Sequence, residues 1–340
     1  CCILTIDSDQ DIKVKGSRKF ANTLSGFKNF YEWSVKKHKE VNVPIVYCVE
    51  ATGVYHENLS FFLHDNNCNI SIILASTSNK YLASLGLKSK TDPIDAKGLA
   101  QMGAERKLTL WNPPAKFYSD LRSLTRHHQS LTEDKTAVSN KLHAMNHSSK
   151  PSKFVIKQLE KQIKNFDKNL ELTSQQITES IDSRPEIRSK VDKACTIHGV
   201  GEHTVAVIIA ETFGFKLFKS DKQLISYCGY DVVENQSGKT TGKTRISKKG
   251  CSRIRRAMHF PAFNAMRPDQ PIFYNLYHRT FERHHIKMKS YVAVQKKLLI
   301  TIYALWKNDT EFEPQYQIKL INPTSKKVVP IKPELHQVQL

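Results

Sequence analysis

The sequence of 340 residues predicts an N-terminal α/β domain, a helical spacer and a mainly α-helical C-terminal domain. Three observations lead to this fold class. Short apolar runs alternate with helical patterns over residues 1–110, apolar residues recur at seven-residue spacing over residues 111–188, and helical patterns return over residues 189–309. Residues 310–340 are polar and contain proline, which predicts a poorly ordered tail.

The α/β prediction depends on the order of strand-like and helical segments in the first 110 residues. The strand-like segments are residues 2–6, 12–15, 18–22, 45–49 and 70–74. The first three predict a three-strand meander, and helical patterns at residues 24–35 and 57–64 separate the later runs. Strands that alternate with helices in this order are typical of an α/β domain.

Four acidic residues occupy positions where such a domain exposes a ligand site. Asp7 and Glu50 each follow an apolar run, at the strand end that an α/β sheet turns toward a ligand crevice. Asp92 and Asp95 begin a helix, with Asp92 as the expected cap, and their spacing of three places both carboxylates on one face. Converging carboxylates repel one another unless cations lie between them, and a pair of Mg²⁺ ions held in this way serves phosphoryl transfer.

Each acid also has a structural interpretation that spacing alone leaves open. Asp92 can serve only as a helix cap, and Asp95 only as a first-turn acid stabilised by the helix dipole. Asp7 and Glu50 can end their strands in solvent.

The chain is strongly basic. Lys and Arg number 52 against 32 Asp and Glu, which gives a formal net charge of +20, and the basic residues are spread along the chain. This balance favours a polyanion as the partner. A ribosomal or membrane-surface protein would share this charge, so the chemistry has to be inferred from other residues.

The sequence argues against several other classes of protein. No apolar run approaches the roughly 18–20 residues of a membrane helix, and no signal peptide precedes the first strand-like segment. The seven cysteines are scattered and never form C-x-x-C, which fits a reducing compartment and argues against structural zinc. We therefore expect a soluble, cytoplasmic protein with no membrane partner.

The spacer contains two apolar repeats on either side of a break at residues 148–152. The first repeat consists of Phe117, Leu124, Leu131, Val138 and Met145, and the second of Ile156, Leu159, Ile163, Phe166, Leu170 and Ile177. These heptads predict either an antiparallel helical hairpin or a dimerising coiled coil, without catalytic residues.

Ser237 lies before Gly238 in a loop-like segment rich in glycine, lysine and threonine. A serine that attacks phosphate needs room for the backbone to approach and cations that offset the developing charge. Gly238 provides the room, and Lys239 and Lys243 provide the cations. The alternative is a flexible basic loop that only contacts phosphates.

A nucleotide P-loop does not fit this segment, although Gly-Lys-Thr occurs twice in it. That motif requires a glycine five residues before the Gly-Lys pair, and those positions hold Val233 and Ser237.

Two further features of the C-terminal domain fit a phosphate backbone. Gly199-Val200-Gly201 resembles the turn of helix-hairpin-helix modules, in which backbone amides meet a DNA phosphate, although an ordinary tight turn would look the same. A basic segment follows the serine and consists of Arg245, Lys248, Lys249, Arg253, Arg255 and Arg256. Such a segment suits DNA and RNA equally, with binding that weakens as salt rises.

Together these motifs resemble the insertion-sequence transposases of the DEDD type, to which the Piv and MooV DNA invertases are related. The matching segments are VEATGVYH at 49–56, KTDPIDA at 90–96, GVG at 199–201, YCG at 227–229 and SG at 237–238. They stand in the family's order, and the resemblance extends over about residues 3–307.

The resemblance implies a RuvC-like N-terminal domain of the ribonuclease H type, with Asp7, Glu50, Asp92 and Asp95 as ligands of Mg²⁺. It implies that Ser237 is the nucleophile of the C-terminal domain and forms a phosphoserine link with DNA. Members of the family use a structured guide RNA, encoded beside their gene, and assemble into oligomers on it. By this resemblance we expect a dimer or tetramer associated with the nucleoid of a prokaryotic cell.

The chain departs from the family pattern at positions next to the assigned residues. The usual Gly-Ile-Asp-Val around the first acid is Thr5-Ile6-Asp7-Ser8 here, a usual proline is Asp231, and a usual asparagine is Cys251. Two alternatives to an active transposase stay open: a site-specific DNA invertase with the same residues, and a catalytically inactive nucleic-acid-binding relative.

Overall fold

The computed structural model describes residues 1–38, 43–86, 89, 91–234, 236–238, 240–242 and 244–315. The chain divides into two compact units, Cys1–Pro113 and Pro114–Leu340. The predicted tail lies largely outside the described residues. Within the described part, no helix is long and apolar enough to span a bilayer.

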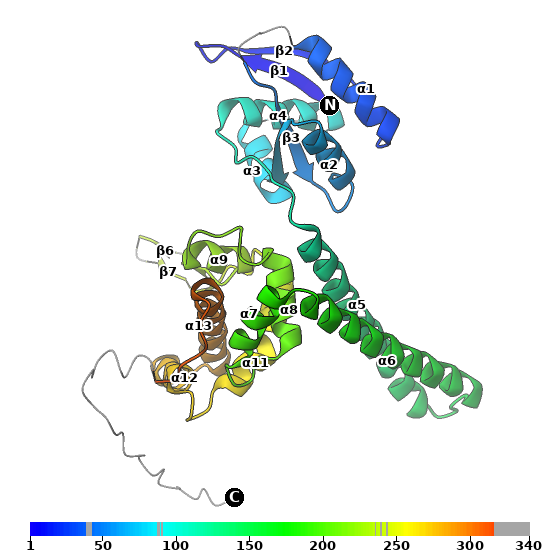
Figure 1. The fold of residues 1–340 in the computed structure, drawn as a ribbon, viewed down its shortest axis with the longest axis vertical. Helices are drawn as coiled ribbons and strands as arrows, with labels where there is room; N and C mark the ends of the chain where they lie inside the picture. Colours follow the sequence, from blue (N-terminus) through cyan, green and yellow to red (C-terminus); the bar gives the residue numbers. More distant parts are fainter. Residues whose placement is uncertain are drawn as a thin grey trace, which may run out of the picture. The chain divides into compact units, whose positions relative to one another are not determined.

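The first unit contains two pairs of strands with helices packed against them (Figure 1). Strands β1 (Cys2–Ile6) and β2 (Ile12–Ser17) are antiparallel, whereas β3 (Val46–Ala51) and β4 (Asn69–Leu74) are parallel. The helices are α1 (Leu24–Lys37), α2 (Glu57–Asp65), α3 (Ala75–Ser84) and α4 (Asp92–Glu105). Helix α2 provides the crossover that a parallel pair requires. The α/β character predicted for this region is therefore confirmed.

The meander has two strands, so the predicted third strand at residues 18–22 is wrong. Strand pairing ends where Arg18 N donates to Cys1 O at 3.1 Å. The ring of Phe20 then packs against Phe30 and Trp33 of α1, with ring centroids 5.4 Å apart in each case. Thr23 caps α1 by accepting a hydrogen bond from Gly26 N. The segment is thus held by aromatic packing and a helix cap instead of strand hydrogen bonds.

Strands β1 and β3 are not hydrogen-bonded to each other within the described residues. A cavity of about 550 Å³ lies between them, lined also by α1 and α4. The continuous sheet of a ribonuclease H fold is therefore not formed here, and the RuvC-like topology stays a prediction.

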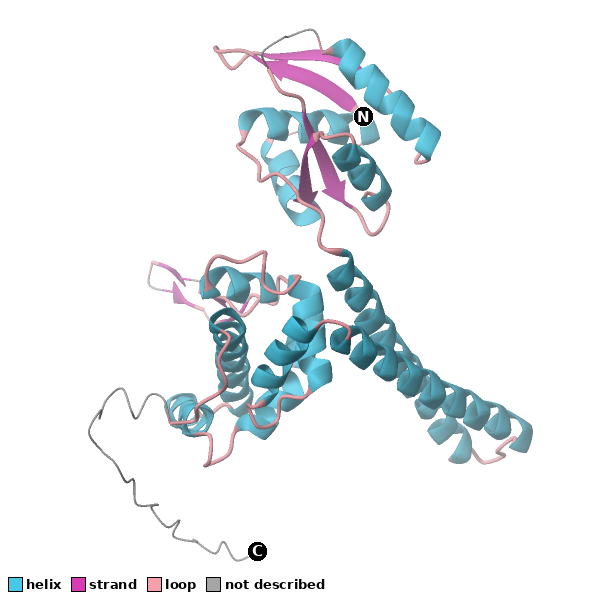
Figure 2. Ribbon diagram, viewed as in Figure 1, coloured by secondary structure: helices cyan, strands magenta, loops and turns pink. Residues whose placement is uncertain are grey.

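The heptad segments form two long helices, α5 (Lys116–Asn146) and α6 (Lys153–Asp182), which pack side by side as an antiparallel hairpin (Figure 2). Leu131 and Val138 of the first repeat are buried, as a core-facing position requires. Of the two predicted arrangements, the structure shows the hairpin within one chain. Its ends near Phe117 and Ile181 belong to the main core of the second unit.

The rest of the second unit is mainly helical, as predicted, and is built around α8 (Glu202–Thr212). All residues from Val205 to Thr212 are buried, because four other helices pack against α8. The helices packed on α8 are α5, α6, α7 (Pro185–Cys195) and α10 (Ser252–Ala257). The unit also contains α9 (Asp221–Cys228), α11 (His259–Ala265), α12 (Pro271–His284) and α13 (Lys287–Asn308), and α13 packs on α7, α9, α11 and α12. Four two-residue strands lie between α9 and α10: β5 (Val232–Val233), β6 (Gln236–Ser237), β7 (Thr240–Thr241) and β8 (Arg245–Ile246).

Candidate functional site

Ser237 lies near the tip of a β-hairpin and not in an irregular loop. Strand β6 pairs with β7, so that Ser237 lies opposite Thr240, and β5 pairs with β8 nearer the base. We call residues 232–246 the serine hairpin; its tip projects from the helices near α9 (Figure 1). Gly238 has φ +54°, which a tight hairpin turn demands and glycine adopts without strain. The Ser237 side chain is exposed beside this glycine.

The base of the serine hairpin is fixed by backbone hydrogen bonds. Cys251 N donates to Tyr227 O at 2.8 Å, and Lys248 N donates to Gly229 O at 3.1 Å. Gly250 has φ +154°, and a Cβ there would lie 2.3 Å from Tyr227 O, so no larger residue fits. Tyr227 and Gly229 of the YCG motif thus anchor the hairpin to the end of α9.

Asp231, one of the departures from the family pattern, has a structural role in this anchor. Its carboxylate accepts a 2.7 Å hydrogen bond from Ser247 Oγ, and its carbonyl accepts a 2.8 Å bond from Ser247 N. These contacts close the hairpin where the family usually has proline.

Six of the eight predicted nucleic-acid-binding cations lie within the described residues, and they form two groups. Arg245, Lys248 and Lys249 are exposed, whereas Lys239 and Lys243 lie outside the described residues. The other three are engaged in contacts within the chain: Arg255 donates to Cys228 O and Gly250 O, Arg256 pairs with Glu133, and Arg253 lies 3.8 Å from Glu211.

The glycine turn between α7 and α8 is packed against the rest of the second unit. Gly199 has φ +93°, and a Cβ there would lie 2.7 Å from the Cβ of Asn264. The backbone of His198 both donates to and accepts from the side chain of Gln270, which is buried. Gly201 is the exposed N-cap of α8, and it stands directly before Glu202. Gly199 therefore has a packing role, whereas Gly201 is accessible to a ligand.

Asp7 and Glu50 differ in how their carboxylates are held. Asp7 lies in the β1–β2 turn, where a hydrogen bond from Asp11 N, and then the contact with Lys13, lower the pKa of its carboxyl. Glu50 is the fifth residue of β3, and its Oε2 accepts a 2.6 Å hydrogen bond from the buried hydroxyl of Ser78.

Asp92 and Asp95 occupy the first turn of α4, but Asp92 is not the cap as predicted. The N-cap is Thr91, and Asp92 is the first helical residue, so Pro93 stands one position later than expected. Thr91 O accepts from Asp95 N at 2.9 Å, which closes the first turn. Both acids thus lie at the positive end of the helix dipole.

The structure does not gather all four acids. Burial lowers the pKa of the Cys1 α-amino group, and the charge of Asp92 acts against this, so Asp92 lies near Cys1, the residue before β1. Glu50 lines a cavity of about 290 Å³ together with Cys1. Asp7 lies beyond the opposite end of β1, and the described residues contain no group of three possible metal ligands. The oxygen donors suit Mg²⁺, but their placement here does not form its site.

Glu211 is a buried acid on α8 that the sequence analysis missed. Arg126 binds it with both ends of the guanidinium, at 2.7 and 2.9 Å, and Arg122 lies 3.4 Å away. Burial would raise the pKa of Glu211, but the hydrogen bonds from Arg126 and the nearby arginine charges outweigh it and lower the pKa. Arg253 completes this cluster, which ties α5 and α10 to α8 beside the serine hairpin. The sequence does contain a signal for this residue: Glu211 lies inside the apolar run 205–212, and an acid buried in such a run requires a cationic partner.

Comparison with known families accounts for both units. Residues 1–148 match the DEDD transposases of the IS110 type, and residues 191–278 match the transposase IS116/IS110/IS902 family. Together the matches cover more than half of the chain. The chain belongs to the IS110 family of DEDD transposases.

Two relatives are similar to this transposase over most of its length. The pilin gene-inverting proteins of Moraxella bovis and Moraxella lacunata are each 26% identical to it over 299 residues, which is 86% of this chain and 89% of each relative. The match to residues 1–148 contains the four acids, and the match to residues 191–278 contains the serine hairpin and Glu211. The IS110 family and these relatives support the assignment of DNA rearrangement to this chain.

Proposed function

We propose that this transposase cleaves and rejoins DNA through a covalent bond between Ser237 and a DNA phosphate. In the first step Ser237 Oγ attacks the phosphorus, a new P–O bond forms, and the bond to one strand end breaks. The serine proton is removed, and the departing strand end leaves as a hydroxyl. In the second step the hydroxyl of another strand attacks the same phosphorus, which rejoins DNA and regenerates the serine.

The observation that carries this proposal is the exposure of Ser237 beside Gly238 on a hairpin whose base is anchored. The glycine has no side chain to keep a phosphate backbone away, and the anchored base limits the motion of the nucleophile. Arg245 is exposed on β8 nearer the base of the same hairpin, from where its side chain can offset charge on the transferring phosphoryl group.

We further propose that Asp7, Glu50, Asp92 and Asp95 hold Mg²⁺, as two ions. Magnesium would supply positive charge at the oxygens of the reacting phosphate. The proposal requires Asp7 to approach the other acids, and the cavity between β1 and β3 gives the β1–β2 pair room to move. We derive no reaction step from these ions, because the acids are not gathered in this structure.

The proposed partners are DNA, a structured guide RNA encoded beside the gene, and further copies of the chain. The formal charge of +20 exceeds what a single short contact with phosphate needs, and it suits two nucleic acids held at once. A homo-oligomer, either a dimer or a tetramer, would bring the acids of one copy to Ser237 of the same or another copy. The site of action would be the nucleoid in the cytoplasm of a prokaryotic cell.

Site-specific inversion is the second candidate, and similarity to the pilin gene-inverting proteins favours it. The two activities differ in their products. Purified protein would be incubated with Mg²⁺, RNA from beside the gene, and plasmids that carry either element ends or inverted sites. Sequenced insertion or excision products support transposition, and inverted products support inversion. If folded, DNA-binding protein gives neither product with any of these substrates, recombinase activity is contradicted.

A further inference from the structure

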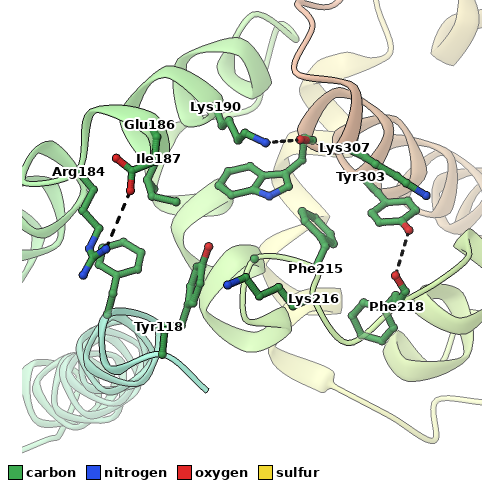
Figure 3. Close-up of a pocket in the computed structure, with 14 residues that line it drawn as sticks. Tyr118, Arg184, Glu186, Ile187, Lys190, Phe215, Lys216, Phe218, Tyr303 and Lys307 are labelled. Carbon is green, nitrogen blue, oxygen red and sulfur yellow. Dashed lines mark hydrogen bonds and ion pairs between the residues drawn. The ribbon is translucent and has the colours of Figure 1, made fainter. Parts of the chain in front are cut away.

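The second unit contains a pocket of about 480 Å³ that the proposed strand chemistry does not use (Figure 3). It is lined by the start of α5, by α7, by the turn at residues 214–218 and by the end of α13. The volume falls in the range of small-molecule sites in proteins. The four segments belong to one unit, so its packed core fixes their positions.

Aromatic rings form one part of the lining. Tyr118, Phe215, Tyr303 and Trp306 are all largely buried. The ring of Phe215 lies 5.2 Å from that of Tyr303 and 6.0 Å from that of Trp306, measured between centroids. Because the rings pack on one another, they form a rigid apolar surface at the pocket.

Cations form the other part of the lining. Arg184, Lys190, Lys216 and Lys307 line the pocket together with one acid, Glu186, and Figure 3 shows them around it. Each cation lies within 6 Å of a ring: Arg184 of Phe117, Lys190 of Trp306, Lys216 of Tyr118, and Lys307 of Tyr303. The lining thus carries a net charge of +3.

Two of the four cations already have polar contacts within the protein. Lys190 Nζ donates to Trp306 O at 3.0 Å, and Arg184 lies 4.0 Å from Glu186. Lys216 and Lys307 are exposed at the rim. These two lysines are therefore the cations best placed to meet an anion from solvent.

We propose that this pocket binds one nucleotide of a single-stranded nucleic acid. A base would contact the parts of the aromatic rings that remain exposed, and the phosphates on either side of it would contact Lys216, beside Tyr118, and Lys307, beside Tyr303. A planar ring with an attached anion uses both parts of the lining, whereas a simple anion uses only the lysines and a neutral aromatic molecule only the rings. The net charge disfavours cationic ligands. The proposal goes beyond the recombinase function and does not involve Ser237.

Trp306 provides a direct measurement. The sequence contains three tryptophans, and the other two, Trp33 and Trp111, lie in the first unit. In the full chain with Trp33→Phe and Trp111→Phe, all tryptophan fluorescence comes from the pocket. We expect a (dT)₅ oligonucleotide and thymidine monophosphate to quench it saturably. Comparison of these two probes distinguishes a nucleotide within a strand from a free one.

The variants K216A and K307A should together weaken the (dT)₅ affinity about tenfold or more. Lys157 is an exposed lysine of α6 outside the pocket lining, so K157A should leave the affinity unchanged. Ser237→Ala should also bind (dT)₅ as the wild type does, because the pocket does not involve Ser237. The binding result therefore tests this proposal independently of the proposed strand chemistry.

Three results would overturn the proposal: no quenching by either probe, an equal loss of affinity in K157A, or equal quenching by inorganic phosphate alone. If the double tryptophan variant does not fold, the wild-type chain can be cross-linked by light to (dT)₅ carrying one 4-thiothymidine. Adducts at Tyr118, Tyr303 or Trp306 support the pocket, and adducts confined to other peptides contradict it.

Discussion

The hydroxyl of Ser78, which is 1% exposed, donates a 2.6 Å hydrogen bond to Glu50 Oε2. Ser78 belongs to α3 and Glu50 to β3, so this bond fixes a proposed metal ligand against a neighbouring helix. The second carboxylate oxygen accepts from Thr52 Oγ1 at 3.2 Å. Such partners orient a ligand before the metal binds.

Removal of this bond should weaken metal binding. We expect Ser78→Ala to reduce Mn²⁺ affinity, measured by calorimetry or electron paramagnetic resonance, by about 10- to 100-fold. Ser84→Ala, on the exposed end of the same helix, is the matched control and should bind Mn²⁺ as the wild type does. Equal affinities of Ser78→Ala and wild type would argue against Glu50 as a ligand.

Neutralisation of Glu211 should destabilise the second unit. Glu211→Gln leaves the guanidinium groups of Arg122 and Arg126 without their shared carboxylate. Because the two arginines are 31% and 36% exposed, we expect a loss of about 2–3 kcal/mol, below that of a fully buried pair. Urea unfolding followed by circular dichroism measures this loss. Glu133→Gln, which removes an exposed ion pair with Arg256, should change the free energy of unfolding by about 1 kcal/mol or less. Similar effects of the two substitutions would contradict the account of Glu211.

The same carboxylate should make stability depend on pH in a definite direction. The pKa of Glu211 is lowered in the folded protein from an ordinary value of 4.5, so the unfolded chain binds the proton more readily. Its contribution is fully present above about pH 4.5 and is lost as the pH falls through the folded pKa. The free-energy difference between wild type and Glu211→Gln should therefore shrink on acidification below pH 4.5. If this free-energy difference grows on acidification, the pKa of Glu211 is raised in the folded protein and not lowered.

Glycine is needed at position 250 but not at 201. Ala at 250 would adopt φ near +154° and bring its Cβ within 2.3 Å of Tyr227 O, so we expect a loss of about 1–3 kcal/mol. Gly201 has φ −98°, and a Cβ there would meet no described atom within 4 Å. Gly201→Ala should therefore lose only the N-cap preference for glycine over alanine, about 1 kcal/mol or less. Thermal unfolding of both variants measures the two losses of stability. Equal losses would contradict the different roles of Gly250 and Gly201.

Elements with strong periodicity could be predicted from the sequence. The heptads placed α5 and α6, because apolar side chains at seven-residue spacing form one continuous buried stripe. Helix α3 was missed, because its Ser- and Thr-rich sequence has little apolar periodicity. The segment at 18–22 looked like a strand because local alternation does not reveal that Phe20 packs against Phe30 and Trp33.

The candidate site was only partly predictable. The four acids and Ser237 were found from motifs, but their spatial arrangement depends on contacts distant in sequence, such as that between Glu50 and Ser78. The serine hairpin was expected to be a loop because strands of two residues carry no periodic pattern. Residues such as Arg255 looked like phosphate ligands because sequence alone does not reveal the backbone carbonyls that they bind.

The central claim is that Ser237 forms a covalent bond with DNA. The most direct measurement incubates the protein with end-labelled element-junction DNA, flanking RNA and Mg²⁺, followed by denaturing electrophoresis and peptide mapping. We predict an adduct at Ser237 in the wild type, its loss in Ser237→Ala, and its retention in Ser226→Ala, a control at an exposed serine of α9. An equal adduct in Ser237→Ala, or a phosphate mapped to another residue, would contradict the claim.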